Sequence, residues 1–245
     1  IFDTKTGKKT YTSTVMPLRG AWLEYETDGN DIFWVRVDRT RKVPVTTLLR
    51  AIGVITDNQI KELFGDEELI NATIAKDPIK DQDEALIEIY KKLRPGELPT
   101  ADAAKNLFNG LFFDNRRYDL AKVGRYKFNQ KLALSARIKN QVAASDIVDG
   151  ETGEVFVQAG ETITPEVAEN IQNSGINTVE IMVNDRKVKV IGNGTVDIHK
   201  VFPDVDLSEL NFKEFVNYNV LKDIIDHTDK KDLLKVLKER HNELV

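Results

Sequence analysis

The chain has 245 residues, of which 41% are hydrophobic and 31% are charged, and its formal net charge at pH 7 is −5. This composition is typical of a soluble globular protein with a core, and we expect neither a signal peptide nor a membrane span. The acidic balance argues against a free-standing nucleic-acid coat, although a local basic stripe stays possible. Cysteine is absent, which excludes disulfides and thiolate chemistry and fits a reducing cytoplasm.

An antiparallel hairpin is predicted within residues 18–44, after a turn at 3–9 and a strand over 12–17. Side chains alternate with period two on both sides of a polar turn at 28–31. Trp22 falls on the same side as Glu24 and Glu26, where a core tryptophan is not expected, so it is a candidate contact residue. The set that faces the expected core is Ala21, Leu23, Tyr25, Phe33, Val35 and Val37.

The return strand leads into a basic run, residues 36–42, in which four cations stand against one carboxylate and give a local charge of +3. Arginine neutralises phosphate, and an exposed indole offers a surface on which a base stacks, so this combination suits a nucleic acid. It equally suits a solvated edge strand whose charges discourage aggregation. The residues alone leave both interpretations open.

After Pro44 the hydrophobic period changes to that of helices. The capping-box pattern Thr56–Gln59 marks one helix start, and Thr100 marks another. A well-patterned amphipathic helix should end at Arg94, because the following Pro95 disfavours helical geometry. The helices predicted here cover residues 45–53, 57–65, 66–75 and 83–93, a segment after Thr100, and a segment after Asp119.

A small inserted module is predicted over residues 145–192, with a hairpin, a helix beginning at Thr164-Pro165 and a strand over 179–183. Residues 193–206 are predicted to form a loop, and 207–216, 220–227 and 230–245 to form helices. The predicted organisation is therefore a lobe over 1–144, the module over 145–192, and a helical continuation of the lobe over 193–245. The predicted fold class is α+β, mainly helical, with an N-terminal antiparallel hairpin.

No catalytic constellation is present. The three histidines lie far apart and outside any metal-ligand spacing. Asp204 and Asp206 could hold Mg²⁺, but a loop turn explains the pair more simply. No G-x-S-x-G motif occurs, which disfavours an independent hydrolase. We therefore predict no catalytic residue, no cofactor and no metal site in this chain.

Three phrases carry a resemblance: RGAWLEYETDGNDIFWVRVDRTRKVPVTTLLRAIG, ALIEIYKKLRPGELPT and LFFDNRRYDLAKVGRYKFNQKL. They resemble, in the same order, the lobe domain of the bacterial DNA-directed RNA polymerase beta subunit. The resemblance is strong over residues 14–51 and 83–132 and weakest after Ala133. The inserted segment is similar to the small beta–beta-prime modules of large bacterial polymerase subunits. Because residue 1 is not methionine, we expect a piece of a longer subunit.

The resemblance implies one jaw of a DNA cleft, which contacts downstream duplex and the non-template single strand near the transcription start. The implied partners are DNA, the beta-prime and alpha subunits and the sigma factor, and nucleotidyl transfer is implied to occur on residues outside this chain. The implied DNA-binding residues are Trp22, which stacks on an unpaired base, Asp38, Arg39 and Arg41 close to that strand, and Arg94 and Arg117 beside it.

Simpler roles stay open for two of these residues. Arg94 fits a cation favoured by the dipole at a helix C-terminus, and Arg117 fits a surface ion pair. A different class of function also stays open, namely a scaffold that grips the sigma factor or accessory proteins and has negligible affinity for DNA. The acidic isoelectric point of about 5.4 and the polar module favour this alternative.

Overall fold

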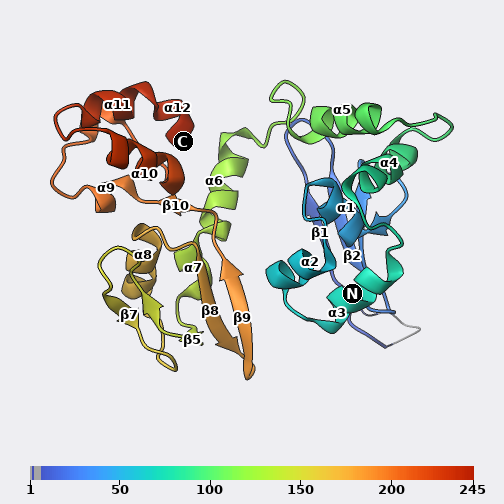
Figure 1. Ribbon diagram of the computed structural model, residues 1–245, viewed down its shortest axis with the longest axis horizontal. Coiled ribbons are helices and arrows are strands. Elements are labelled where there is room, and N and C mark those ends of the chain that lie inside the picture. The colour runs from blue at the N-terminus through green and yellow to red at the C-terminus, as the bar shows by residue number, and fades with distance from the viewer. Residues whose placement is uncertain (1, 3–6) are drawn as a thin grey trace. The chain divides into compact units, whose positions relative to one another are not determined.

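The computed structural model describes Phe2 and residues 7–245, and these divide into two compact units, Ile1–Gly124 and Arg125–Val245 (Figure 1). The turn predicted at residues 3–9 lies largely outside the described residues. Among the described residues, no helix has the length and apolarity that a membrane crossing requires.

The first unit is built on an antiparallel sheet. Leu23 lies opposite Val37, and Tyr25 lies opposite Val35, so one face of the hairpin is apolar, and Val35 and Val37 are buried. At the turn, Oδ1 of Asp28 accepts hydrogen bonds from the amides of Asn30 and Ile32, at 3.0 Å each. The predicted hairpin and its two faces are confirmed. The strand order is β1 (Thr12–Val15), β2 (Leu23–Thr27), β3 (Phe33–Val37) and β4 (Val43–Pro44).

Helices pack against the apolar face of this sheet. Thr56 forms the predicted capping box with Gln59, and the Thr100 side chain caps the later helix by accepting from the amide of Ala103 at 3.2 Å. Leu86 and Phe108 share the core with Val35. The helices of this unit are α1 (Val45–Ala51), α2 (Asp57–Phe64), α3 (Glu68–Lys76), α4 (Gln82–Leu93) and α5 (Ala101–Phe112).

A buried polar network ties α1 to the chain that follows α3. Arg50 is 1% exposed, and its Nε lies 3.8 Å from Oδ2 of Asp77, which is itself buried. The same carboxylate accepts hydrogen bonds from the hydroxyls of Thr46 at 2.5 Å and Thr47 at 3.1 Å. The guanidinium also donates to Asp57. The hydrophobic period of α1 did not predict that Arg50 is buried. An arginine is buried only where acceptors surround it, and these acceptors come from distant parts of the chain.

Substitution of Asp77 by asparagine keeps the shape of the side chain and removes its charge. We expect the free energy of unfolding of the first unit to fall by about 3 kcal/mol, because the buried guanidinium loses one of its two anionic partners. Both tryptophans, Trp22 and Trp34, lie in this unit, so tryptophan fluorescence during urea titration follows its unfolding alone.

Asp57→Asn is the matched control, since this second partner of Arg50 has a side chain that is 41% exposed. Its substitution should cost much less, because water replaces the lost contact. If both substitutions lowered the free energy of unfolding equally, the buried pair of Arg50 and Asp77 would not be the more important one.

The second unit begins in helix α6 (Ala121–Leu132), which crosses the boundary between the units. The predicted hairpin of the module is present as β6 and β7, and the Thr164 side chain caps the predicted helix by accepting from the amide of Val167. The elements of this part are α7 (Leu134–Ile138), β5 (Val142–Ala143), β6 (Ile147–Val148), β7 (Val155–Val157), α8 (Pro165–Asn173), β8 (Thr178–Val183) and β9 (Arg186–Ile191). With sheets and helices in both units, the predicted α+β fold class is confirmed.

The last part of the chain differs most from its prediction. The predicted loop 193–206 contains a short strand and a helix, and the predicted helix 207–216 is a 3₁₀ turn followed by a strand. The predicted terminal helix is interrupted at Arg240, whose side chain bonds Asp223 at 2.6 Å and Glu243 at 2.7 Å. The elements are β10 (Thr195–Val196), α9 (Ile198–Val201), η1 (Ser208–Leu210), β11 (Val216–Asn217), α10 (Tyr218–His227), α11 (Leu233–Glu239) and α12 (His241–Leu244).

The module at 145–192 stays a prediction, and the packing indicates another N-terminal boundary for it. Leu134, Ile138 and Ala143 precede Ser145, yet they share one buried cluster with β7, α8, β8 and β9. A Cβ placed on Gly192 would lie 2.9 Å from Cβ of Leu134, so the two ends of segment 134–192 are in contact. Adjacent ends are what an inserted unit requires. We therefore propose that the separable unit begins at Leu134.

Two deletions distinguish these starts. Replacing residues 134–192 with a short Gly/Ser linker should leave a monomeric protein, because the whole cluster is removed together. Replacing only 145–192 should expose the remaining apolar side chains, which would bind an apolar dye and aggregate. Gel filtration and dye fluorescence measure both effects, and tryptophan fluorescence should be unchanged in both variants. If the 145–192 deletion were soluble and the 134–192 deletion aggregated, the module would begin at Ser145.

Candidate nucleic-acid interface

Trp22 lies at the end of the sheet, on the face that is turned away from the core. It immediately precedes β2, and its carbonyl oxygen accepts a hydrogen bond from the amide of Asp38 at 2.8 Å. This bond extends the ladder of the hairpin past the last pair, Leu23 and Val37. The Trp22 side chain is only partly buried, as its parity in the strand predicts. The structure therefore places Trp22 and Asp38 side by side.

Arg39 lies over the ring of Trp22. Cζ of its guanidinium is 4.3 Å from the ring centroid, which is a cation–π contact. The turn of residues 37–40 positions it, with the amide of Thr40 donating to the carbonyl of Val37 at 3.2 Å. Both central residues have positive φ, 50° for Asp38 and 62° for Arg39. Aspartate tolerates this conformation, but for arginine it is strained, at a cost on the order of 1 kcal/mol.

A second tryptophan, which the sequence interpretation did not single out, lies on the same face of the sheet. Nε1 of Trp34 donates to Oδ2 of Asp28 at 2.7 Å, and Nζ of Lys42 lies 4.9 Å from the Trp34 ring. Lys42 also donates to Glu26 at 2.8 Å, and Arg36 lies 3.5 Å from the same carboxylate. Trp34 could have been found from the sequence, because the alternation of the strands places it on the same face as Trp22.

Glu26 and Asp28 stay ionised and neutralise part of the positive charge on this face of the sheet. The hydrogen bond from Lys42 holds the pKa of Glu26 below its usual value. Burial acts to raise the pKa of Asp28, but hydrogen bonds from the Trp34 indole and from two backbone amides outweigh it and leave this pKa lowered. Arg36 and Lys42 are therefore neutralised within the sheet. Arg41 is exposed and has no hydrogen bond or ion pair among the described residues.

The loop that holds Arg117 is fixed beside the entry to β2. The backbone of Asp119 pairs with that of Arg19, at 2.8 and 3.1 Å. Tyr118 packs so closely on Gly20 that a Cβ there would lie 2.6 Å from its ring. Arg117 itself is 70% exposed and lies 3.5 Å from Asp114, so the ion pair considered as its simpler role is present. An exposed pair of this kind contributes little to stability and leaves the guanidinium accessible.

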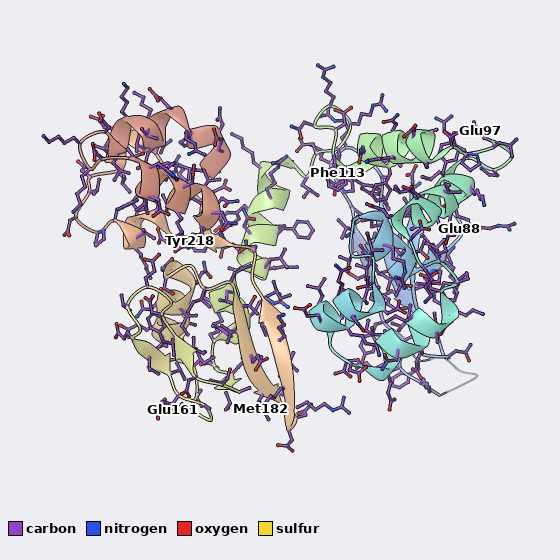
Figure 2. The ribbon with its side chains drawn as sticks, in the orientation of Figure 1. Glu88, Glu97, Phe113, Glu161, Met182 and Tyr218 are labelled. Carbon is purple, nitrogen blue, oxygen red and sulfur yellow. The ribbon has the colours of Figure 1, made fainter. Side chains whose placement is uncertain are left out.

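Arg94 lies elsewhere on the unit. It is the C-cap residue of α4, and its guanidinium lies 3.3 Å from Glu97, which also accepts from the hydroxyl of Tyr90. Figure 2 shows Glu97 and Phe113 at opposite ends of α5. A helix of 12 residues is about 18 Å long at roughly 1.5 Å per residue. None of the described contacts joins Arg94 to Trp22, Asp38 and Arg39.

No group of three or more histidine, aspartate or glutamate side chains within the described part of the chain could hold a metal ion. Asp206 accepts from the amide of Ser208 at 3.0 Å, which is the loop-turn arrangement considered for it. His241 stacks on Phe212 with a centroid distance of 4.8 Å, so it belongs to the packing of the second unit.

The strain at Arg39 is open to a direct test. Arg39→Ala and Arg39→Gly both lose the contact with Trp22, but only glycine adopts positive φ without cost. We expect the glycine variant to be the more stable of the two by about 1 kcal/mol. Urea titration with fluorescence detection measures the difference.

Arg41 provides the control, because it is equally exposed and its φ is not positive. There the alanine variant should be at least as stable as the glycine variant. The same order at both positions would mean that the backbone at Arg39 is not strained.

The chain matches, over residues 2–149, a family model described as RNA polymerase Rpb2, domain 2. It is 57% identical over 242 residues to the DNA-directed RNA polymerase subunit beta of Clostridium novyi (strain NT), covering 98% of this chain and 19% of that protein. The subunit of Clostridioides difficile (strain 630) is 57% identical over 243 residues, covering 98% and 20%. That of Clostridium botulinum (strain Hall) is 56% identical over 231 residues, covering 94% and 19%. The chain thus spans about a fifth of the length of these relatives.

Proposed function

Because the chain belongs to the RNA polymerase Rpb2 domain 2 family, we propose that it is the lobe domain of a bacterial RNA polymerase beta subunit and contacts DNA. Its proposed targets are the downstream duplex and the non-template single strand near the transcription start. The proposed protein partners are the beta-prime and alpha subunits and the sigma factor, in the cytoplasm. Nucleotidyl transfer is proposed to take place on residues outside this chain.

The observation that carries the proposal is the pairing of Trp22 with Arg39. A ring that is partly exposed on the outer face of a sheet offers a platform for one base, and the guanidinium lies over the ring at 4.3 Å. Stacking on an aromatic side chain stabilises binding by about 1–3 kcal/mol per base. The guanidinium in turn neutralises a phosphate near the stacked nucleotide.

Asp38 adds a preference for bases over phosphates. Its carboxylate is exposed next to Trp22, where it repels phosphate and accepts hydrogen bonds from the amino group of an unpaired base. Arg41 and Arg117 are accessible cations for the backbone of the same strand. Arg94, beyond the other end of α5, would contact a different nucleotide from the one at Trp22.

Trp22→Ala tests the proposal at two levels. In the isolated chain the melting temperature should barely change, because truncating a core tryptophan would cost about 3–5 kcal/mol and Trp22 is not in the core. In reconstituted polymerase, promoter complexes should lose about 1–3 kcal/mol of stability. Circular dichroism measures the first effect, and the lifetime of promoter complexes measures the second.

Trp22→Phe serves as the control, since a smaller ring still stacks and should restore most of the lifetime. If Trp22→Ala unfolded the isolated chain while promoter complexes remained unchanged, Trp22 would be a core residue and not a DNA contact. A stable alanine variant with unchanged complexes would favour the scaffold, and single-strand binding by the isolated chain would then show no salt dependence.

A further inference from the structure

A groove of about 500 Å³ lies in the last part of the second unit, among the loop after α9, the end of α10 and the start of α11 (Figure 1). Its lining is mainly apolar and includes Phe202, Val205, Ile225 and Leu234. A cavity of this size and composition is typical of binding sites. All of its lining residues lie within 201–234, so the groove is complete within this unit.

Two large apolar side chains of the groove remain exposed. Ile225 on α10 is 40% exposed, and Leu234 on α11 is 45% exposed. Their neighbours Ile224 and Leu233 are buried in the core of this part of the chain, so both helices already contribute to that core. Exposed aliphatic side chains that meet in one groove lose their contact with water only when a partner covers them. We therefore interpret Ile225 and Leu234 as apolar contacts for a partner.

The side of the groove that α11 forms is basic. Lys230 lines the groove, and Lys238 shares the face of Leu234, because it follows Leu234 by four residues in the helix. Residues 230–238 contain four lysines and one aspartate, which gives a local charge of +3. In the part of the chain that the structure describes, these lysines make no ion pair or hydrogen bond. They are Lys230, Lys231, Lys235 and Lys238.

The neighbouring carboxylates do not share this face. Asp229 and Asp232 precede Leu234 by five and two residues, and Glu239 follows it by five, which are not the spacings of side chains that meet on a helix. Asp204 is the one carboxylate among the lining residues, and it belongs to the loop after α9. The groove is therefore basic along α11 and has an acidic group at the loop.

The groove offers no strand edge to an occupant. None of its lining residues belongs to β10 or β11. An extended segment that entered this apolar groove would leave its backbone amides and carbonyls without partners. A helix satisfies these groups internally and can lay an apolar face in the groove.

We propose that this groove binds an acidic amphipathic helix of a partner protein. Apolar side chains of that helix cover Ile225 and Leu234, and carboxylates along its flank pair with the lysines of the α11 side. The apolar contacts supply most of the affinity, whereas ion pairs at the rim favour acidic partners over basic ones. The proposal depends on residues of the second unit alone and not on the proposed DNA contact at Trp22.

The test uses the full 245-residue chain and two synthetic amphipathic helical peptides, labelled with a fluorophore. Both peptides have the same leucine and phenylalanine face, but one has glutamates on its flanks and the other has lysines. Fluorescence anisotropy at several salt concentrations measures the Kd of each. We expect the acidic peptide to bind more tightly than the basic one, with a difference that decreases as salt screens the charges.

Two variants separate the charged and apolar contributions. Lys230→Glu combined with Lys238→Glu should weaken the acidic peptide by about tenfold, the equivalent of two exposed ion pairs, and should strengthen the basic peptide. Leu234→Ala should weaken both peptides, because both use the same apolar contact. Circular dichroism verifies that each variant is folded.

The matched control is Lys187→Glu combined with Lys213→Glu. These two lysines are exposed, lie in the second unit outside the groove, and change the net charge by the same amount. The preference for the acidic peptide should be unchanged. An equal loss in the control, equal binding of the two peptides, or binding of neither by the parent chain would overturn the proposal.

Two further probes distinguish a protein partner from other polyanions. If a short DNA duplex or vesicles of anionic lipid bound Lys230 and Lys238 more tightly than the acidic peptide, the proposal would be wrong. Trp22→Ala should leave peptide binding unchanged, so that loss of the proposed DNA contact and loss of this groove's role are measured separately.

Discussion

The pairing register of β2 and β3 is the constraint on which the first unit depends. Because side chains alternate across a sheet, the register that buries Val35 and Val37 also places Trp22 and Trp34 on the outer face. A slip of one residue would exchange the two faces, so the core holds the candidate interface in place. The Asp28 carboxylate secures this register at the turn, through two backbone amides and the Trp34 indole. The same hydrogen-bond ladder therefore stabilises the first unit and holds the candidate contact residues on its outer face.

Features encoded by neighbouring residues could be predicted from the sequence. Period-two alternation predicted the hairpin, and cap residues such as Thr56, Thr100 and Thr164 predicted helix starts. Features that depend on distant residues could not. The burial of Arg50 requires Asp77, and the short elements after residue 193 form because their side chains share a small core that overrides local periodicity. For the site, parity predicted the position of Trp22, but only the structure shows Glu97, the ion-pair partner of Arg94, at the opposite end of α5 from Phe113.

The turn at Asp38 and Arg39 shows why the stacked pair could not be inferred from the basic run. Hairpin turns with two positive φ values usually contain glycine, asparagine or aspartate, and here the second of the two positions holds an arginine. The strain of an arginine in this conformation is comparable with the roughly 0.5–1 kcal/mol that an exposed cation–π contact supplies. The two effects nearly cancel, so the turn gains little stability from Arg39. Strained backbone of this kind is concentrated at functional sites, which favours a role in binding over one in folding.

The outer face of the sheet carries little net charge. Glu26 pairs with both Arg36 and Lys42, and Asp28 is bonded to the Trp34 indole, so two carboxylates offset these two cations around the tryptophans. The proposed contact there therefore depends on stacking and on the Asp38 carboxylate. Stacking requires an unpaired base, whereas phosphate attraction acts on any duplex and is screened by salt. Because a chain with a net charge of −5 repels DNA at long range, the proposed contact depends on short-range stacking at Trp22 and not on the overall charge.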